Sequence, residues 1–160
     1  MVRVSFDPYS ATWPETFAVE ARRIETALAG VRIEVHHAGS TSVPGLRAKP
    51  IIDIVLGVSD STDEDAYVHA LVGAGYEFVL REPDWFEHRL LKRADPKVNL
   101  HVFSTGSAEI ERMLAFRNID RCHRRRRLRP APVTAPRSNS RRGQRDGPWR
   151  TIWAPAFTTQ

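Results

Sequence analysis

A single carboxylate interrupts a run of large apolar residues. Asp53 lies within residues 51–56, which otherwise contain only isoleucine, valine and leucine. Removing an unpaired carboxylate from water is costly, so this side chain needs a partner. One explanation is structural: Asp53 lies at a strand end, where it caps backbone N–H groups or pairs with Lys49 or Arg47. The other is functional: Asp53 lies at the edge of a cleft and ligates a divalent cation, for which carboxylate oxygen is a preferred ligand.

The loop before Asp53 has the composition of an anion-binding turn. Gly39 allows a ligand to approach the backbone closely, and Ser40, Thr41 and Ser42 add three hydroxyl groups. Turns that present N–H groups beside hydroxyls suit phosphate oxygens. Lys49 would then supply a fixed positive charge near the carboxylate. The alternative is an ordinary strand connection whose hydroxyls cap a short helical turn at residues 46–49.

Later strand-like segments offer further candidates for such a site. Polar and apolar side chains alternate in residues 97–103, so His101 would face the cleft beside Asp53 if the apolar set packs against helices. His88 and Arg89 are alternative contacts for a phosphate group. These assignments depend on strand register, because a shift of one residue reverses the faces.

The motifs around the loop resemble the signature of a known family. In residues 34–56, Gly-Ser-Thr-Ser-Val-Pro-Gly-Leu is followed by Lys-Pro-Ile-Ile-Asp-Ile. This pattern closely resembles the GrpB family, whose members also occur fused to bacterial dephospho-CoA kinases. That family is similar in fold to the nucleotidyltransferases, whose motif is a Gly-Ser after one strand and an Asp-hydrophobic-Asp/Glu on the next. Gly39, Ser40 and Asp53 match this motif, whereas Val55 replaces the second carboxylate.

The resemblance implies roles for individual residues. It implies Mg²⁺ at Asp53 with His101 as the nearest further ligand, and a phosphate contact at Arg117, which ends a family-like Leu-Phe-Arg segment. His37 stands where the family usually has a histidine, and the alternative for it is a ring locked by hydrogen bonds beneath the loop. Polymerase-type nucleotidyl transfer normally uses several carboxylates. The carboxylate set is therefore incomplete for that chemistry.

Two functions fit this pattern. The first is a transferase domain that binds a nucleotide or another phosphate-bearing small molecule with a divalent metal and transfers a nucleotidyl group. The second is a noncatalytic nucleotide-binding or folding-assistance module, as the fusion of relatives to dephospho-CoA kinase suggests. Asp53 favours the first function and Val55 favours the second.

Length and composition agree with a small domain. The chain has 160 residues, 41% of them hydrophobic, and no apolar run approaches the roughly 20 residues of a membrane span. Its start lacks the apolar stretch of a secretory signal, so we expect a cytoplasmic protein with no membrane partner. The single cysteine, Cys122, cannot form an internal disulfide.

Charge divides the chain into two parts. Residues 1–116 carry 12 basic and 17 acidic side chains, for a net charge of −5, whereas residues 117–160 carry 12 and 2, for +10. We therefore expect a GrpB-like domain at residues 1–118 and an Arg/Pro-rich, poorly ordered tail at 119–160 that is atypical of the family. The tail is an inert extension, a segment that binds nucleic acid through Arg124 to Arg127, or the product of a reading-frame shift, which we favour.

Hydrophobic periodicity predicts the elements that position these residues. We expect helices at residues 12–28, from about 61 to 74 and after Ser107, with a capping box at Thr12, Trp13 in the core and Glu20 on a solvated face. The expected strands are residues 2–6, 31–35, 51–56, 76–81, 85–92 and 97–103. These helices and strands predict a domain of the α/β class in its broad sense, more narrowly α+β. We expect a nucleotidyltransferase-like mixed sheet of about five strands, with helices mainly on one face.

Overall fold

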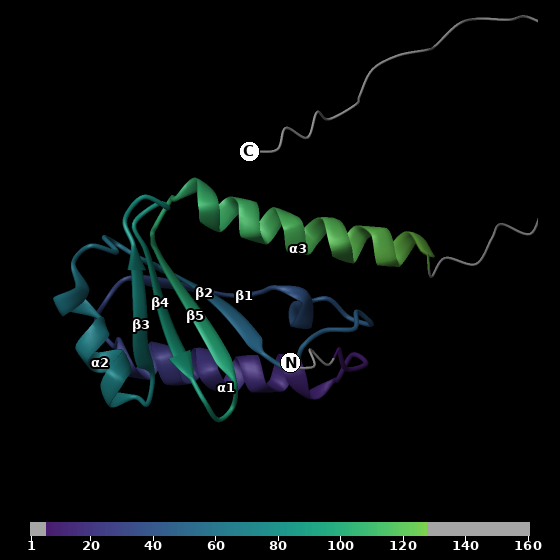
Figure 1. Ribbon diagram of the computed structural model, residues 1–160, viewed down its shortest axis with the longest axis horizontal. Helices are drawn as coiled ribbons and strands as arrows, with labels where there is room; N and C mark the ends of the chain where they lie inside the picture. Colours follow the sequence, from purple (N-terminus) through teal and green to yellow (C-terminus); the bar gives the residue numbers. More distant parts are fainter. Residues whose placement is uncertain (1–5, 128–160) are drawn as a thin grey trace, which may run out of the picture. The chain divides into compact units, whose positions relative to one another are not determined.

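The computed structural model describes residues 6–127, which form a mixed α+β domain (Figure 1). The strands are β1 (Ile33–Ala38), β2 (Ile52–Val58), β3 (Glu77–Glu82), β4 (His88–Arg93) and β5 (Val98–Ser104). The α-helices are α1 (Thr12–Ala27), α2 (Val68–Gly73) and α3 (Ala108–Arg127), and the 3₁₀ helices are η1 (Ser40–Ser42) and η2 (Glu64–Ala66). Most of the strand expected at residues 2–6 and most of the tail lie outside the described residues.

The five described strands form one sheet in the order β1-β2-β5-β4-β3. Strands β2 and β5 are parallel, and the other neighbours are antiparallel. The predicted mixed sheet of about five strands is therefore confirmed. The parallel pairing aligns Asp53 with Asn99 and Val55 with His101, which brings residues about 46 positions apart to the same place.

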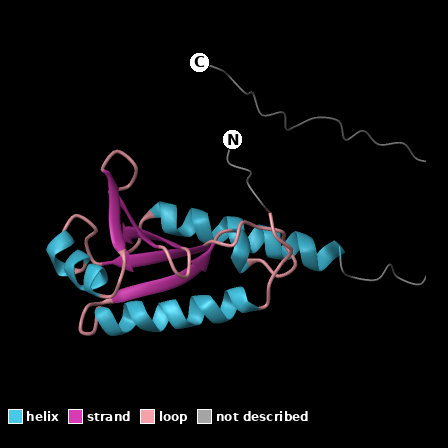
Figure 2. Cartoon of the chain, turned by 60° about the horizontal axis from the view of Figure 1, so that its bottom comes forward, coloured by secondary structure: helices cyan, strands magenta, loops and turns pink. Residues whose placement is uncertain are grey.

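Helices cover both faces of this sheet. Helices α1 and α2 pack on one face, against a core that includes Ile54 of β2 and Leu100 of β5. Helix α3 packs on the other face, against Val55 and Phe103. Figure 2 shows α1 and α3 on opposite sides of the strands. Alternate residues of β2 and β5 thus belong to different cores, and α3 covers part of the face that carries Asp53.

One apolar stripe fixes the position of α1. Trp13 is buried, as predicted, and Ile24 and Leu28 are buried with it. The predicted capping box at Thr12 is wrong, because the helix begins at Thr12 itself. The Thr12 N–H donates to Ser10 Oγ at 3.2 Å, and Ala11 occupies the cap position.

The expected solvated position of Glu20 is also wrong. Its side chain is fully buried and accepts a hydrogen bond of 2.6 Å from the Tyr76 hydroxyl. Arg23 and Arg93 lie 3.3 and 3.8 Å from the same carboxylate. Two arginines and a tyrosine therefore compensate the cost of burying this charge, and together they join α1 to the sheet.

The other two helical segments differ in length from the predictions. The segment from residue 61 is divided between η2 and the short α2, in which His69 is exposed. Ser107 precedes α3, and its Oγ accepts a hydrogen bond of 3.4 Å from the Glu109 N–H. Helix α3 runs without a break across residue 118, the predicted domain boundary. None of the helices in the described residues is long and apolar enough to cross a membrane.

Candidate functional site

The turn after β1 brings Gly39 against Asp53. Gly39 has a φ of +67°, a left-handed value that favours glycine, and a Cβ at this position would collide with Asp53 Oδ2. The close contact depends on the register of β1 and β2, which pairs Ala38 with Asp53. The carboxylate therefore lies directly beside the serine-bearing turn.

The hydroxyl groups of η1 mainly hold the turn together. Ser42 Oγ donates to the Gly39 carbonyl at 2.7 Å, and Thr41 Oγ1 lies 3.1 Å from His37 Nε2. Thr41 and Ser42 are buried, whereas Ser40 is half-exposed. Of the predicted phosphate contacts in this loop, Gly39 and Ser40 are accessible and Thr41 is not.

Asp53 is partly open to solvent and has polar neighbours on β5. Its side chain is 28% exposed, and Oδ1 accepts a hydrogen bond of 2.9 Å from Asn99 Nδ2. His101 Nε2 lies 3.8 Å from the same oxygen. Arg47, one of the basic partners considered for Asp53, instead donates to the Phe6 carbonyl at 2.9 Å, and Lys49 is exposed.

His88 lies behind His101 and has little access to solvent. It is 2% exposed, its Nε2 lies 3.0 Å from His101 Nδ1, and its Nδ1 lies 2.7 Å from Glu82 Oε2. Burial lowers the pKa of His88, and this effect outweighs the opposing one of Glu82. Arg89 points to the other face of β4, where it pairs with Glu64 at 2.7 Å, so the structure does not bring it to Asp53.

His37 and Arg117 join the end of β1 to its neighbours. The His37 ring is buried and stacks on Phe17 with centroids 4.7 Å apart. Arg117 Nη1 of α3 donates to the His37 carbonyl at 3.0 Å. Both residues lie next to the turn, but these contacts support it rather than face a ligand.

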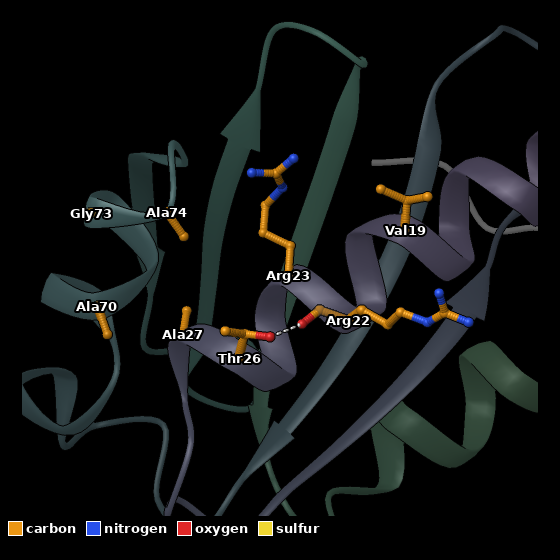
Figure 3. Close-up of a pocket in the computed structure, with 8 residues that line it drawn as sticks. All are labelled: Val19, Arg22, Arg23, Thr26, Ala27, Ala70, Gly73 and Ala74. Atoms are coloured by element: carbon orange, nitrogen blue, oxygen red, sulfur yellow. Dashed lines mark hydrogen bonds between the residues drawn. The ribbon is translucent and has the colours of Figure 1, made fainter.

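A hollow of about 240 Å³ opens beside the turn. It is lined by Gly39, Glu109, Arg112, Met113 and Phe116. A larger hollow of about 480 Å³ lies between α1 and α2, where Figure 3 shows Arg22 and Arg23 pointing in different directions. That second hollow lies on the opposite face of the sheet from Asp53, so it is not the site that the sequence motif predicts.

The donor groups at the turn fit one divalent ion and not two. In residues 6–127, as far as side chains are described, no group of three or more His, Cys, Asp or Glu residues is placed to hold a metal. Asp53 and His101 remain as two donors, and Val55, at the predicted second carboxylate, is fully buried under α3. An ion bound by one or two side chains can complete its coordination with phosphate oxygens and water. The pair of ions used in two-metal phosphoryl transfer lacks ligands here.

Asn99 and Glu82 are site residues that the sequence did not single out. The alternation in β5 places Asn99 on the same face as His101, so the signal for Asn99 was present. The contact of Glu82 with His88 depends on the pairing of β3 with β4, which aligns these two residues. No pattern within one strand reveals such a partner.

The fold of the described residues indicates the class of protein to which the chain belongs. The structure resembles that of a cytoplasmic RNA terminal U-transferase with a TM-score of 0.54 and 13% sequence identity, covering 74% of this chain and 36% of that one. A likeness at this identity concerns the fold alone. The chain is an α+β protein with a nucleotidyltransferase-like fold.

Within that class, the chain belongs to the GrpB family, whose profile, described as GrpB protein, matches residues 3–129. UPF0157 protein BH1888 of Halalkalibacterium halodurans is 56% identical over 110 residues, which cover 69% of this chain and 56% of that relative. UPF0157 protein SCO7215 of Streptomyces coelicolor is 45% identical over 117 residues, covering 73% and 61%.

A solved structure supports the same assignment. The crystal structure of conserved protein GrpB from Enterococcus faecalis matches with a TM-score of 0.67 and 32% identity, covering 76% of this chain and 74% of that one. The chain spans little more than half the length of the curated relatives named above. The family match extends beyond the predicted boundary at residue 118 and ends at residue 129.

Proposed function

We propose that this GrpB-family domain binds a nucleotide, or another phosphate-bearing small molecule, together with one divalent cation at the turn between β1 and β2. The observation that carries the proposal is the position of Asp53. Its carboxylate is partly exposed, lies against Gly39 and faces His101 at 3.8 Å. An acidic donor, an imidazole and an accessible glycine turn are thus in one place.

Each residue has a role in this proposal. The backbone at Gly39 and Ser40 contacts phosphate oxygens, and Asp53 and His101 hold the ion, for which Mg²⁺ is the expectation from the sequence. Asn99 orients the Asp53 carboxylate through its hydrogen bond. When bound, the cation would offset phosphate charge. Lys49 would add a further positive charge for the phosphates.

Two candidate functions share this binding step: nucleotidyl transfer and a noncatalytic binding module. Val55 favours the noncatalytic module. A nucleotidyltransferase motif would have a carboxylate there, and a buried valine cannot replace it. The retained Asp53 favours nucleotidyl transfer. Both candidates share the bound ligand and differ only in whether a bond is broken.

Calorimetric titration with a nucleoside triphosphate and Mg²⁺ tests the binding step. We expect metal-dependent binding that weakens at least 10-fold in Asp53→Asn, because this variant keeps the shape of the side chain and removes its charge. Glu25→Gln, on the exposed side of α1, is the charge-matched control. Equal affinity in Asp53→Asn and the unaltered protein would remove Asp53 from the function. Release of pyrophosphate with a panel of acceptors then separates a transferase from a binding module.

A further inference from the structure

Four side chains form a continuous row from the protein surface to the candidate site. Glu82, at the end of β3, is 45% exposed and lies 2.7 Å from His88 Nδ1. His88 Nε2 lies 3.0 Å from His101 Nδ1, and His101 Nε2 lies 3.8 Å from Asp53 Oδ1. The row thus crosses four strands, β3, β4, β5 and β2. Only its last two members belong to the ion-binding role proposed above.

The chemistry at the outer end of the row gives a direction to each hydrogen bond when both rings are neutral. A carboxylate only accepts, so the His88 Nδ1–H donates to Glu82. A neutral ring with its proton on Nδ1 has a lone pair on Nε2, which accepts from the His101 Nδ1–H. When the His101 ring is neutral, its Nε2 then has a lone pair directed toward Asp53. The 3.8 Å spacing is longer than a hydrogen bond, as expected when two acceptors face each other.

Packing prevents the His88 ring from turning away from this arrangement. The ring is 2% exposed and stacks on Phe103 with centroids 4.8 Å apart. The Trp85 ring meets it edge-on at 4.6 Å. Both nitrogens of His88 therefore stay directed at Glu82 and His101.

We infer that Glu82 and His88 are positioning residues that hold His101 with its Nε2 lone pair available beside Asp53, and that the site prefers a first-row transition-metal ion to Mg²⁺. The inference rests on the proposed function in assuming one divalent ion at this site. An imidazole nitrogen suits ions such as Co²⁺ and Zn²⁺, whereas Mg²⁺ prefers oxygen ligands. Groups that hydrogen-bond to a metal-binding histidine fix its tautomer and raise its basicity.

The tautomer is directly measurable in the metal-free full-length chain. The ¹⁵N chemical shifts of the histidine ring nitrogens distinguish a protonated nitrogen from one with a lone pair, and His101→Ala assigns the relevant signals. We expect the neutral His101 ring to have its proton on Nδ1 and none on Nε2. A protonated Nε2 would overturn the inference, because the ring would then donate to Asp53 and offer no lone pair.

Metal titration tests the preference and the positioning role. Calorimetry with Co²⁺ alone and Mg²⁺ alone, supported by the visible absorption of bound Co²⁺, should give tighter binding of Co²⁺. His88→Phe keeps a buried ring but removes the acceptor, and should weaken Co²⁺ binding roughly 10- to 100-fold. His88→Gln, whose amide can accept from His101 and donate to Glu82, should restore most of that affinity. His69→Gln, on the exposed side of α2, is the matched control.

A second variant tests the positioning role without changing a buried side chain. Glu82→Ala alters a half-exposed side chain and should also weaken Co²⁺ binding while leaving the fold intact. Binding of Mg²⁺ as tight as that of Co²⁺, or unchanged Co²⁺ affinity in both His88→Phe and Glu82→Ala, would overturn the inference.

The inference and the proposed function can fail separately. If nucleotides do not bind but the tautomer and the Co²⁺ preference hold, only the proposed function fails. If nucleotides bind with Mg²⁺ but His101 Nε2 is protonated, or Co²⁺ alone binds no more tightly than Mg²⁺ alone, the function stands and the inference fails.

Discussion

At the scale of single residues, the site depends on an absent side chain as much as on those present. Gly39 lacks a Cβ, and the Asp53 carboxylate occupies the space that a Cβ would need. Its positive φ adds a second reason for glycine. The close approach of turn and carboxylate is therefore built into the backbone at this position.

We predict that Gly39→Ala destabilises the protein by about 2–3 kcal/mol, because the new methyl group meets Asp53 and the backbone conformation becomes strained. Chemical denaturation measures the change. Gly73→Ala is the control, because nothing lies within 4 Å of a Cβ there and its φ is not in the left-handed region. In the background of Asp53→Ala the cost of Gly39→Ala should fall, since one of its two causes is removed. An equal loss of stability in both backgrounds would show that the new methyl group does not collide with Asp53.

Buried polar contacts between elements are where interpretation of the sequence failed. Glu20 follows Phe17 by three positions and precedes Ile24 by four, so helical periodicity places it on the buried face. Its charge suggested solvent instead. The partner that makes burial acceptable, Tyr76, lies 56 residues further along the chain. The local pattern of apolar residues, in contrast, correctly predicted β2, β3 and β5 to within about one or two residues.

The same limit applies to the candidate site. Gly39, Ser40 and Asp53 could be identified because their spacing forms a motif within one short segment. Alternation could place His101 and Asn99 on the correct face, but their contacts with Asp53 and His88 depend on which strands pair. Tertiary pairing, not local composition, therefore decides the second half of the site.

We predict that Tyr76→Phe, which removes only the hydroxyl that joins α1 to the sheet, lowers the free energy of unfolding by about 1.5–3 kcal/mol. The reason is that a buried carboxylate, Glu20, loses a hydrogen-bond donor. Burial, followed by the adjacent Glu20, raises the pKa of Tyr76, so the hydroxyl remains a donor across the normal pH range. Urea denaturation measures the loss, and Glu25→Gln on the exposed side of α1 should change it by less than about 0.5 kcal/mol. If Tyr76→Phe lowered the free energy of unfolding as little as Glu25→Gln does, this hydrogen bond would not stabilise the packing of α1.

The stability that a second set of contacts between elements provides should depend on pH. Glu64 of η2 accepts hydrogen bonds from Arg81 of β3 and Arg89 of β4. The bond from Arg81, with a smaller one from Arg89 and against an opposing effect of burial, holds the pKa of Glu64 below its ordinary value of 4.5. A lowered folded-state pKa means that this stabilisation is complete above about pH 4.5 and is lost as the pH falls through the lower value.

Glu64→Gln should therefore cost about 1 kcal/mol at pH 7, and its difference from the unaltered protein should shrink below about pH 4. Thermal unfolding at a series of pH values measures this difference. Glu77→Gln, at an exposed position of β3, is the control and should show little change. A difference that stays constant down to pH 3 would contradict the role assigned to the Glu64 charge.

At the scale of the whole molecule, the layers of the fold decide which parts of the nucleotidyltransferase motif can be present. Asp53 and Val55 lie on the same face of β2, two residues apart. Asp53 is at the open end beside the turn, whereas Val55 lies under α3 with Ala38, Phe103 and Ile110. The position of α3 therefore separates an accessible carboxylate from an inaccessible neighbour. An apolar residue at position 55 therefore suits the packing on that face.

This argument predicts that Val55→Asp, which restores the second carboxylate of the motif, damages the protein instead of completing its site. An aspartate there would be sealed from water without a partner, and we expect a loss of about 4 kcal/mol or more in the free energy of unfolding. Val55→Thr has nearly the same shape without a charge and should lose only about 1–2 kcal/mol. Because protonation removes the buried charge, the deficit of Val55→Asp should narrow in acid, which chemical denaturation at pH 7 and pH 5 would reveal. A stable Val55→Asp variant that binds a second divalent ion would mean that α3 leaves this position open, and the single-ion site proposed here would then have to be replaced by a paired one.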